Sequence, residues 1–371
     1  MDISVVIAAH NQRDRLRLVL SGLAVQTFSE GQFEVIVVDD GSTDGTGDFL
    51  REYGQMSLKV IPLDTNVGRC RARNIGIAEA RGDLVAFLDG DALPGPDWLA
   101  QHWHLFQHYN GVTSGFQHCV PRLEYAQDPQ SGLPWEDVPA SVAQIMRTYP
   151  DEFRVTEAMI QSDFAAITPL AQEGGYPFPE LKLMQDQVQV LFDQVPDSPI
   201  GWISFYPHNA SAPRVALEEV GGFDEELPHS EGWDLAYRLM RHGYKTRFGA
   251  KAQSYHLYHH HDFFSPQNAF AESQKRHRAI AHMAEKNEDP LLCLIEFWLA
   301  ALWPDPLIPE EMRLPNLIVF HETHQAISSE EMAERVLMLN LHPLRNASRE
   351  SPQKTESQVL AQPGEDADKS E

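Results

Sequence analysis

The sequence has 371 residues, 42% hydrophobic and 22% charged, which is enough for one enlarged globular domain or two modest ones. Acidic residues outnumber basic ones by 54 to 29, giving a formal net charge of -25. This balance argues against general binding to nucleic acid or to an anionic membrane surface, so an anionic substrate would need local help from a cation. The three cysteines are too few and too widely spaced for a disulfide framework or a four-cysteine zinc site, which fits a reducing compartment.

The first ninety residues predict an alternation of strands and helices. Apolar runs predict buried strands at 3–9, 33–38, 58–62 and 84–88. Helical spacing or helix-start signals fall between them, at 13–24, before residue 53 and from residue 69 to 80. This pattern predicts a parallel sheet with helices on both faces.

The N-terminus lacks the basic start and the length of a signal peptide, so the predicted location is cytoplasmic. The longest apolar patch, 291–303, is interrupted by Glu296 and is shorter than the about 20 residues of a spanning helix. We interpret it as a buried or partner-facing helix. The alternative is a peripheral membrane contact through Phe297, Trp298 and Trp303, which resemble interfacial aromatic residues.

Two carboxylates follow the strand at 84–88 where it ends. Asp89 and Asp91 flank Gly90, which lets the chain bend sharply while both acids stay at the edge of the sheet. Ligands of open α/β sheets bind at this edge, and two hard oxygen donors there suit Mg²⁺ or Mn²⁺, which could neutralise a diphosphate. The alternative is an ordinary acidic turn after a strand.

Two further segments could contact a nucleotide. Asp40 follows the second strand and could accept hydrogen bonds from a ribose or a base, although a capped turn without a ligand explains it equally well. Arg69, Arg71 and Arg73 lie close together in an acidic protein, and Arg69 and Arg73 share one helix face. They could hold a diphosphate, or could simply balance neighbouring acids on the surface.

The order of the motifs resembles family-2 glycosyltransferases of the GT-A fold. The resemblance covers roughly 1–115 and 203–262 and depends on five motifs: Val-Val-Ile-Ala-Ala-His-Asn, Val-Val-Asp-Asp-Gly-Ser-Thr-Asp, Asn-Val-Gly-Arg-x-x-Ala-Arg-Asn-x-Gly, Gly-Asp-Leu-Val-Ala-Phe-Leu-Asp-Gly-Asp and Gly-Gly-Phe-Asp-Glu. Each motif is modest alone, but five in this order and spacing are specific.

The resemblance implies the residues that hold the donor. Contacts to the nucleotide sugar are expected from Ala8, His10, Asp40, Asn66, Arg71, Arg73, Asn74, Asp89 and Gly90. The Asp-x-Asp (DXD) motif is expected to bind the metal through Asp89 and Asp91, with Asp91 as the first choice for a direct ligand and His256 completing the protein ligands. An imidazole ligand favours Mn²⁺ over Mg²⁺. Ala92 stands where family members more often carry a third acid.

The sequence departs from the family at the expected catalytic base. Family members usually have Glu-Asp-x-x-Leu-x-x-Arg at a helix start, and aligning this pattern on Leu235 and Arg238 puts Glu231 on the first acid and Gly232 on the second. Glu231 or Asp234 would then have to act as the base, with Glu231 slightly favoured. Loss of activity, leaving a silent donor-binding module, is the other interpretation of Gly232.

The predicted fold is α/β of the GT-A type, with a mostly parallel nucleotide-binding sheet flanked by helices. The predicted glycosyltransferase domain is 1–262, divided into a nucleotide-sugar half (1–115), a variable acceptor-side insertion (116–202) with a short helix near residue 141, and an acceptor half (203–262). A helical C-terminal extension (263–345) and a disordered acidic tail (346–371) follow.

The predicted function is a metal-dependent, inverting transfer of a sugar, from a UDP-sugar, to an acceptor. The sequence does not distinguish between four classes of acceptor: a glycan, a lipid-linked glycan, a natural product and a peptide. The alternatives are a silent nucleotide-sugar-binding module and a nucleotidyltransferase. A nucleotidyltransferase usually has a glycine-rich basic loop after the first strand, whereas this sequence has Ala-Ala-His-Asn there.

Overall fold

The computed structural model describes most of the chain. The described residues are 1–29, 31–109, 111–120, 144, 148, 154–169, 179–227, 229–257, 269–303, 305 and 308–338. The tail predicted for 346–371 and most of the helix predicted near residue 141 lie outside this set.

The predicted alternation of strands and helices is confirmed in the N-terminal part. The elements are β1 (Ile3–Ala9), α1 (Arg13–Ala24), β2 (Phe33–Asp39), α2 (Thr46–Glu52), β3 (Leu58–Pro62), α3 (Arg69–Ala78) and β4 (Leu84–Leu88). The four strands pair in parallel in the order β3-β2-β1-β4. Their carboxyl ends therefore meet at one edge of the sheet, which is where the predicted acids lie.

Four more strands enlarge this sheet. They are β5 (Ala92–Pro94), β6 (Val112–Val120), β7 (Asn209–Pro213) and β8 (Thr246–Leu257). Within the described residues the sheet order is β3-β2-β1-β4-β7-β6-β8-β5, and four of its seven pairings are parallel. β8 extends over twelve residues to Leu257 because it pairs with β6 and β5, which are distant in sequence.

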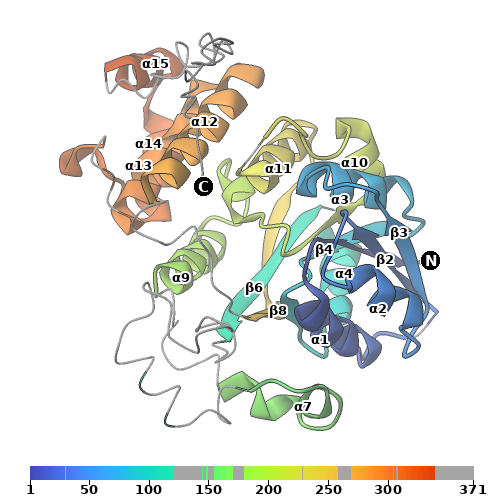
Figure 1. Cartoon of the computed structure of the whole chain (residues 1–371). Helices are drawn as coiled ribbons and strands as arrows, with labels where there is room; N and C mark the ends of the chain where they lie inside the picture. Colours follow the sequence, from blue (N-terminus) through green and yellow to red (C-terminus); the bar gives the residue numbers. More distant parts are fainter. Residues whose placement is uncertain are drawn as a thin grey trace, which may run out of the picture.

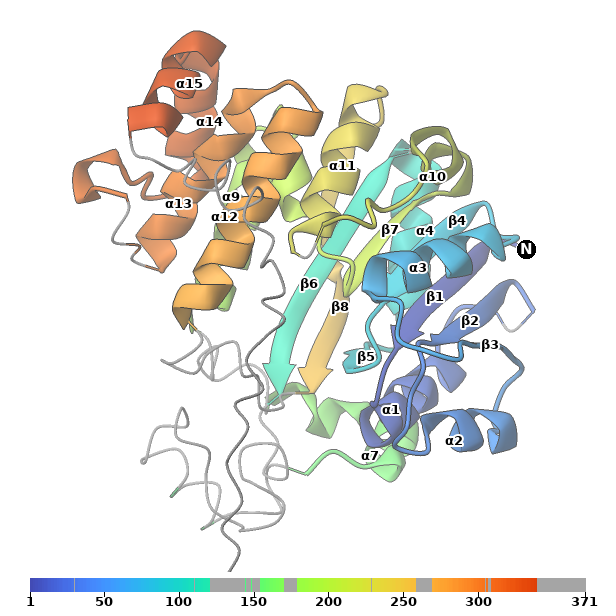
Figure 2. The ribbon, with the colours of Figure 1, turned by 45° about the horizontal axis from the view of Figure 1, so that its top comes forward.

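Helices cover both faces of the sheet, as predicted (Figures 1 and 2). Alternate residues of β1 face opposite layers: Ile3 and Ile7 pack with α1, α2 and α4 (Trp98–Tyr109), whereas Val6 packs with α3. The face with α3 also carries α10 (Arg214–Val220) and α11 (Glu231–Arg241). The shorter elements are α7 (Glu157–Ser162) and the 3₁₀ helices η2 (Phe164–Ala166), η3 (Gly201–Ser204), η5 (Pro290–Cys293) and η6 (Glu310–Met312).

A buried asparagine connects three of the strands. Asn209 donates two hydrogen bonds through its side-chain nitrogen, to the carbonyls of Phe116 (3.1 Å) and Ala252 (2.8 Å). Its side-chain oxygen accepts from Trp98 Nε1 (2.7 Å) and lies 3.0 Å from Nε2 of His102. Burial lowers the pKa of His102 to about 4, so this imidazole is neutral. The pairing of β6 with β8 shifts register between Gly115 and Phe116. The network fixes β6, β7 and β8 beside this shift, and the shift sets the face of the sheet on which each following β8 residue lies.

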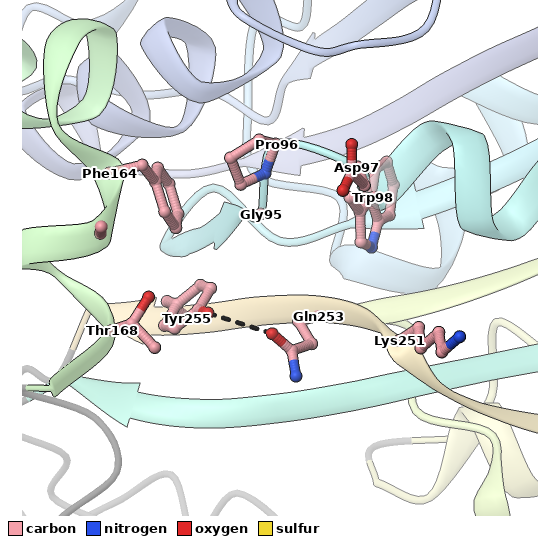
Figure 3. Close-up of a pocket in the computed structure, with 10 residues that line it drawn as sticks. Gly95, Pro96, Asp97, Trp98, Phe164, Thr168, Lys251, Gln253 and Tyr255 are labelled. Carbon is pink, nitrogen blue, oxygen red and sulfur yellow. Dashed lines mark hydrogen bonds between the residues drawn. The ribbon is translucent and has the colours of Figure 1, made fainter.

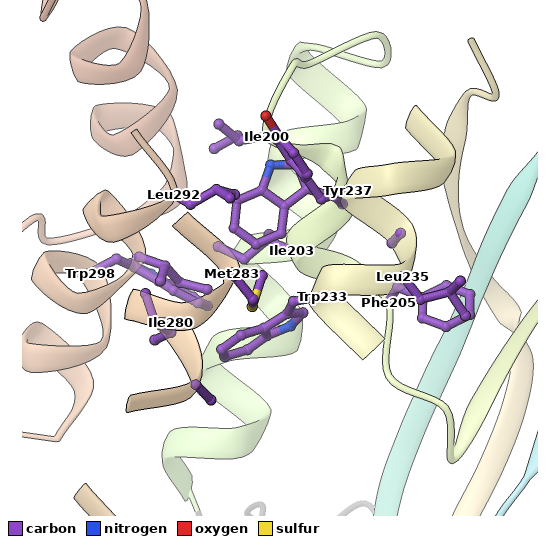
Figure 4. Packing of buried hydrophobic residues seen from close by; sticks show 14 of the residues in the cluster. Ile200, Ile203, Phe205, Trp233, Leu235, Tyr237, Ile280, Met283, Leu292 and Trp298 are labelled. Atoms are coloured by element: carbon purple, nitrogen blue, oxygen red, sulfur yellow. The ribbon is translucent and has the colours of Figure 1, made fainter. Parts of the chain in front are cut away.

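The C-terminal helices pack directly on the sheet domain. They are α12 (Ala269–Lys286), α13 (Leu294–Leu302), α14 (Leu317–Ala326) and α15 (Ser329–Met338), and they lie beside α9 (Pro179–Gln194) and α11 (Figures 1 and 2). Trp233 of α11, Met283 of α12 and Trp298 of α13 belong to one hydrophobic cluster (Figure 4). The cluster also includes Val85 and Phe87 of β4. These helices are therefore part of the same continuous core.

Residues 292–300 of the apolar segment are buried within the described chain, while Trp303 is half-buried. Phe297 and Trp298 are at most 1% exposed, and Trp298 donates its indole N–H to Gln187 of α9 (2.7 Å). The alternative of a membrane contact through these two aromatic residues is therefore wrong, because protein already covers them. Among the described helices, none has both the length and the apolar character to span a bilayer.

We expect the C-terminal helices to lose stability at high pH because of the buried His277. His277 lies 2.7 Å from Glu296 and 2.9 Å from Asp305, with Arg276 and Ser273 bonded to the same acids. Burial lowers the pKa of His277, but Asp305 and Glu296 outweigh this effect and raise it to about 9. The raised pKa contributes on the order of 3 kcal/mol of stability below about pH 6.5, and this contribution is lost as the pH rises through 9.

Thermal melting of the wild type and His277→Gln at pH 6 and pH 9.5 tests this expectation. The difference in melting temperature between the two proteins should be large at pH 6 and should shrink at pH 9.5, since the wild type loses its extra proton there. Lysine, tyrosine and cysteine titration affects both proteins alike. An equal difference at both pH values would contradict the assignment.

Candidate active site

The turn between β4 and β5 brings Asp91 to His256. Ala92 of β5 pairs with His256 of β8, and the N–H of Leu257 donates to the carbonyl of Asp91 (2.8 Å). His256 Nε2 lies 3.8 Å from Asp91 Oδ1, although the two residues are far apart in sequence. Burial lowers the pKa of His256, but Asp91 and Cys119 outweigh it and raise the pKa to about 10. Metal binding would have to displace this proton.

The surroundings of Asp91 fit a cation. Gln12 Nε2 donates to Asp91 Oδ2 (3.2 Å), and Arg15 Nη1 lies 3.7 Å from the same oxygen. Gln12 Oε1 is buried and has no hydrogen-bond partner among the described residues. A carboxylate, an amide oxygen without a partner and an imidazole together form a donor set for Mn²⁺ or Mg²⁺.

Asp89 belongs to a second group of charges. Its Oδ1 accepts from Arg73 Nη2 (2.8 Å), and Arg73 Nη1 donates to Glu231 Oε1 at the start of α11 (2.9 Å). Arg69 Nε lies 3.4 Å from the same Glu231 oxygen, but its side chain is 56% exposed. Asp91 and His256 lie within 4.8 Å of each other, but among the described residues Asp89 does not join them as a third ligand within that distance. Asp224, Glu226 and His282 do form such a group of three, with Lys286 also bonded to Asp224.

Glu231 and Asp234 have different environments. Burial raises the pKa of Glu231, but Arg69 and Arg73 outweigh it and lower the pKa to about 2. Glu231 is therefore ionised and shares Arg73 with Asp89. Asp234 is fully buried, and its Oδ2 accepts from Arg238 Nη2 (2.7 Å) one turn along α11. Asp234 thus fixes Arg238, which in turn bonds to the carbonyls of Val220 and Gly222.

Packing accounts for Gly232. A Cβ at this position would lie 2.6 Å from Pro207 Cδ and 2.7 Å from the carbonyl oxygen of Phe205. The first turn of α11 therefore approaches the 205–207 segment too closely for a side chain. The close packing after η3 fills the space that the second acid of the family pattern would need.

We expect substitution of Gly232 to destabilise the fold. Gly232→Ala would force the 205–207 backbone to move and should lower the free energy of unfolding by about 1–3 kcal/mol, and Gly232→Asp by more. Gly54→Ala is the control, because nothing lies within 4 Å of a Cβ there. Chemical denaturation measures both changes. Gly232→Asp with wild-type stability would contradict the packing explanation.

Several residues predicted to bind the nucleotide form hydrogen bonds between the loops at this edge of the sheet. Both Asp40 oxygens accept backbone N–H bonds, from Val67 (2.7 Å) and Gly68 (3.1 Å), and His10 Nδ1 lies 2.7 Å from the Asp40 carbonyl. Asp40 thus connects the end of β2 to the start of α3. Half-buried Ala8 is next to this junction on β1, opposite Val38.

The remaining predicted residues lie on or before α3. Asn66 is exposed and accepts from the N–H of Gly68 (3.1 Å). Asn74 exchanges hydrogen bonds with the backbone of Phe223 (2.8 and 2.9 Å), so it connects α3 to the Gly-Gly-Phe-Asp-Glu turn. Arg71 is exposed and forms no ion pair with a described residue, so the structure does not join it to Arg69 and Arg73.

Two residues of this region, Arg15 and His208, were not predicted as site residues. No sequence signal indicates them, because each reaches the site only through the tertiary fold. Arg69, which was predicted as a possible diphosphate ligand, lies beside Glu231. Burial lowers the pKa of half-buried His208 to about 4 although the charges of Asp89 and Asp91 act on it.

The comparisons with known proteins identify the family. Residues 4–160 match the family model described as "Glycosyl transferase family 2", and this part of the chain belongs to that family. The predicted family and the GT-A type of mixed α/β fold are thus confirmed.

Two curated relatives and one solved structure illustrate the similarity. The chain is 31% identical over 245 residues to a validoxylamine A glucosyltransferase of Streptomyces hygroscopicus subsp. limoneus, which covers 65% of this chain and 48% of the relative. It is 28% identical over 273 residues to the uncharacterized glycosyltransferase YfnE of Bacillus subtilis (70% and 65% covered). S. aureus TarS 1-349 in complex with UDP-GlcNAc aligns with a TM-score of 0.48 and 16% identity (94% and 92% covered). The chain spans about half the length of the validoxylamine relative.

Proposed function

We propose that this protein is a metal-dependent glycosyltransferase that moves a sugar from a nucleoside diphosphate sugar, of the UDP-sugar class, to an acceptor hydroxyl. The observation that carries the proposal is the convergence of two groups at the end of β4: Asp91 with His256, and Asp89 with Arg73 and Glu231. The family match of residues 4–160 and the glucosyltransferase among the relatives support a hexose donor.

In this proposal the two groups have separate tasks. Asp91 and His256, with Gln12 beside them, would hold a divalent cation, which would supply positive charge near the diphosphate. Arg69 is exposed enough to turn from Glu231 to a phosphate oxygen, whereas buried Arg73 keeps Asp89 and Glu231 aligned. The exposed Arg71 is available to the nucleotide as well.

Glu231 is the proposed base. Its carboxylate takes the proton of the acceptor hydroxyl while the hydroxyl oxygen attacks the anomeric carbon and the bond to the diphosphate breaks. The direct displacement inverts the anomeric configuration and releases the nucleoside diphosphate. Both acids are buried and paired with arginines, but Glu231 shares Arg73 with Asp89 of the Asp-x-Asp motif, whereas Asp234 pairs with Arg238 of its own helix and is therefore less suitable. The close packing at Gly232 also weakens the alternative of a silent module, since it gives a structural reason for the missing acid.

Incubation with Mn²⁺ and a panel of UDP- and GDP-sugars tests the proposal. The expected result is release of the nucleoside diphosphate in the presence of the metal. A chelator should prevent this release. Saturable UDP binding without turnover would favour a silent binding module. Release of pyrophosphate from a nucleoside triphosphate and a sugar phosphate would favour a nucleotidyltransferase.

A further inference from the structure

A pocket of about 280 Å³ lies behind the strand that carries His256. Its lining comes from three segments: the loop after β5, η2 with the residues that follow it, and β8 (Figure 3). Neighbouring residues of a strand point to opposite faces, so Tyr255 and Gln253 face the pocket while His256 faces the candidate active site. The pocket and the Asp91–His256 pair therefore share one strand layer.

Aromatic rings form the apolar part of the lining. Phe164 of η2 is half-buried and packs edge-on against Tyr255, with ring centroids 5.3 Å apart and planes at 69°. Tyr255 is 2% exposed and Trp98 is fully buried, so these two rings belong to the core and support Phe164, whose ring is accessible to a ligand. A ring held in place by its neighbours binds a flat apolar ligand face at little entropic cost.

Polar groups surround these rings, and three of them have unused hydrogen-bonding capacity. Gln253 Oε1 accepts from the hydroxyl of Tyr255 (3.2 Å), while its amide nitrogen has no described partner. Asp97 Oδ1 accepts from Thr27 Oγ1 (2.7 Å), but Asp97 has no cation among the described residues. Lys251 is exposed and forms no described ion pair. The pocket thus offers an amide, a carboxylate and an ammonium group.

We propose that this pocket binds one pyranose unit of the acceptor. A pyranose ring has an apolar C–H face that fits against Phe164, and its hydroxyls can both donate to Asp97 and accept from Lys251 and Gln253. The volume suits a ligand of that size, below the range of drug-sized ligands. That the bound pyranose belongs to the acceptor rests on the proposed transferase function. That the pocket binds a pyranose does not depend on that function.

Saturation-transfer NMR on the full chain tests the inference without donor or metal. The probes are the methyl pyranosides of glucose, galactose, mannose and N-acetylglucosamine, with a linear trisaccharide of each. Ala165→Trp fills the mouth of the pocket from an exposed position, and Phe164→Ala removes the stacking surface. At least one pyranoside should give a signal that both variants reduce by about tenfold or more, while Asp83→Ala keeps it, because Asp83 is exposed and is not in the lining.

The outcomes separate this inference from the proposed function. No signal from any probe, or a signal that survives Ala165→Trp, overturns the pocket assignment whatever the transferase assay gives. Binding of a monosaccharide with exclusion of its trisaccharide also overturns it, since an acceptor unit must accept a continuing chain. Should Phe164→Ala fail to fold, Ala165→Trp carries the test. Pocket binding together with absent sugar transfer would instead count against the proposed function.

Discussion

Replacing Asp91 by alanine should lower donor affinity by at least about 100-fold in the presence of Mn²⁺, because the carboxylate facing His256 is the proposed direct metal ligand. Asp91→Asn should have an intermediate effect, since an amide oxygen is a weaker ligand than a carboxylate. Titration calorimetry with UDP, with and without a chelator, measures the metal-dependent part of the affinity.

The matched control for Asp91 lies at the other end of the same strand. Asp83 precedes β4 and is exposed, so Asp83→Ala should bind UDP as the wild type does. Circular dichroism should be unchanged in all variants. If Asp91→Ala and the wild type bind UDP equally, with and without chelator, Asp91 does not hold the metal.

Replacing Glu231 by glutamine should slow sugar transfer by about 10²–10⁴-fold and leave the affinity for the donor nearly unchanged. Glutamine keeps the shape of the side chain and can still accept from Arg73 through its amide oxygen, but it cannot take a proton. Because the folded pKa of Glu231 is lowered to about 2, the wild-type rate should show no loss from protonation of this carboxylate between pH 5 and pH 8.

Two further variants distinguish the candidate bases. Asp234→Asn weakens the buried pair with Arg238 and should therefore lower the melting temperature. Its effect should not be confined to the chemical step. Glu218→Gln, on the exposed side of α10, should leave both rate and stability near wild type. Full activity of Glu231→Gln would move the base to another residue.

The parts of the fold that local patterns specify could be predicted from the sequence. β1, α1 and β3 have the predicted bounds, because their hydrophobic periodicity and flanking turns act within a few residues. The first half of the sheet follows, since alternating strands and helices allow few topologies. β5, β6 and β7 were not predicted, because their sequences lack a regular alternation of apolar and polar residues and the strands are stabilised by partners distant in sequence.

The same division applies to the site. The Asp-x-Asp motif, the arginine-containing helix and Glu231 could be recognised from residue types and spacing. That Asp40 and Asn74 hold loops together, and that Asp234 is paired with Arg238, could not be, because a sequence does not reveal which hydrogen-bonding groups are already occupied. The membrane alternative for Phe297 and Trp298 was wrong for the same reason: their burial depends on α9 and α14.

By itself the sequence determined the family, the order of the first strands and helices, and the residue types at the end of β4. Only the tertiary structure decided that His256 lies against Asp91, that Arg73 connects Asp89 to Glu231, and that no side chain fits at residue 232. Local propensity acts over a few neighbouring residues, whereas each of these three relations joins segments that meet only when the sheet is complete and its helices have packed.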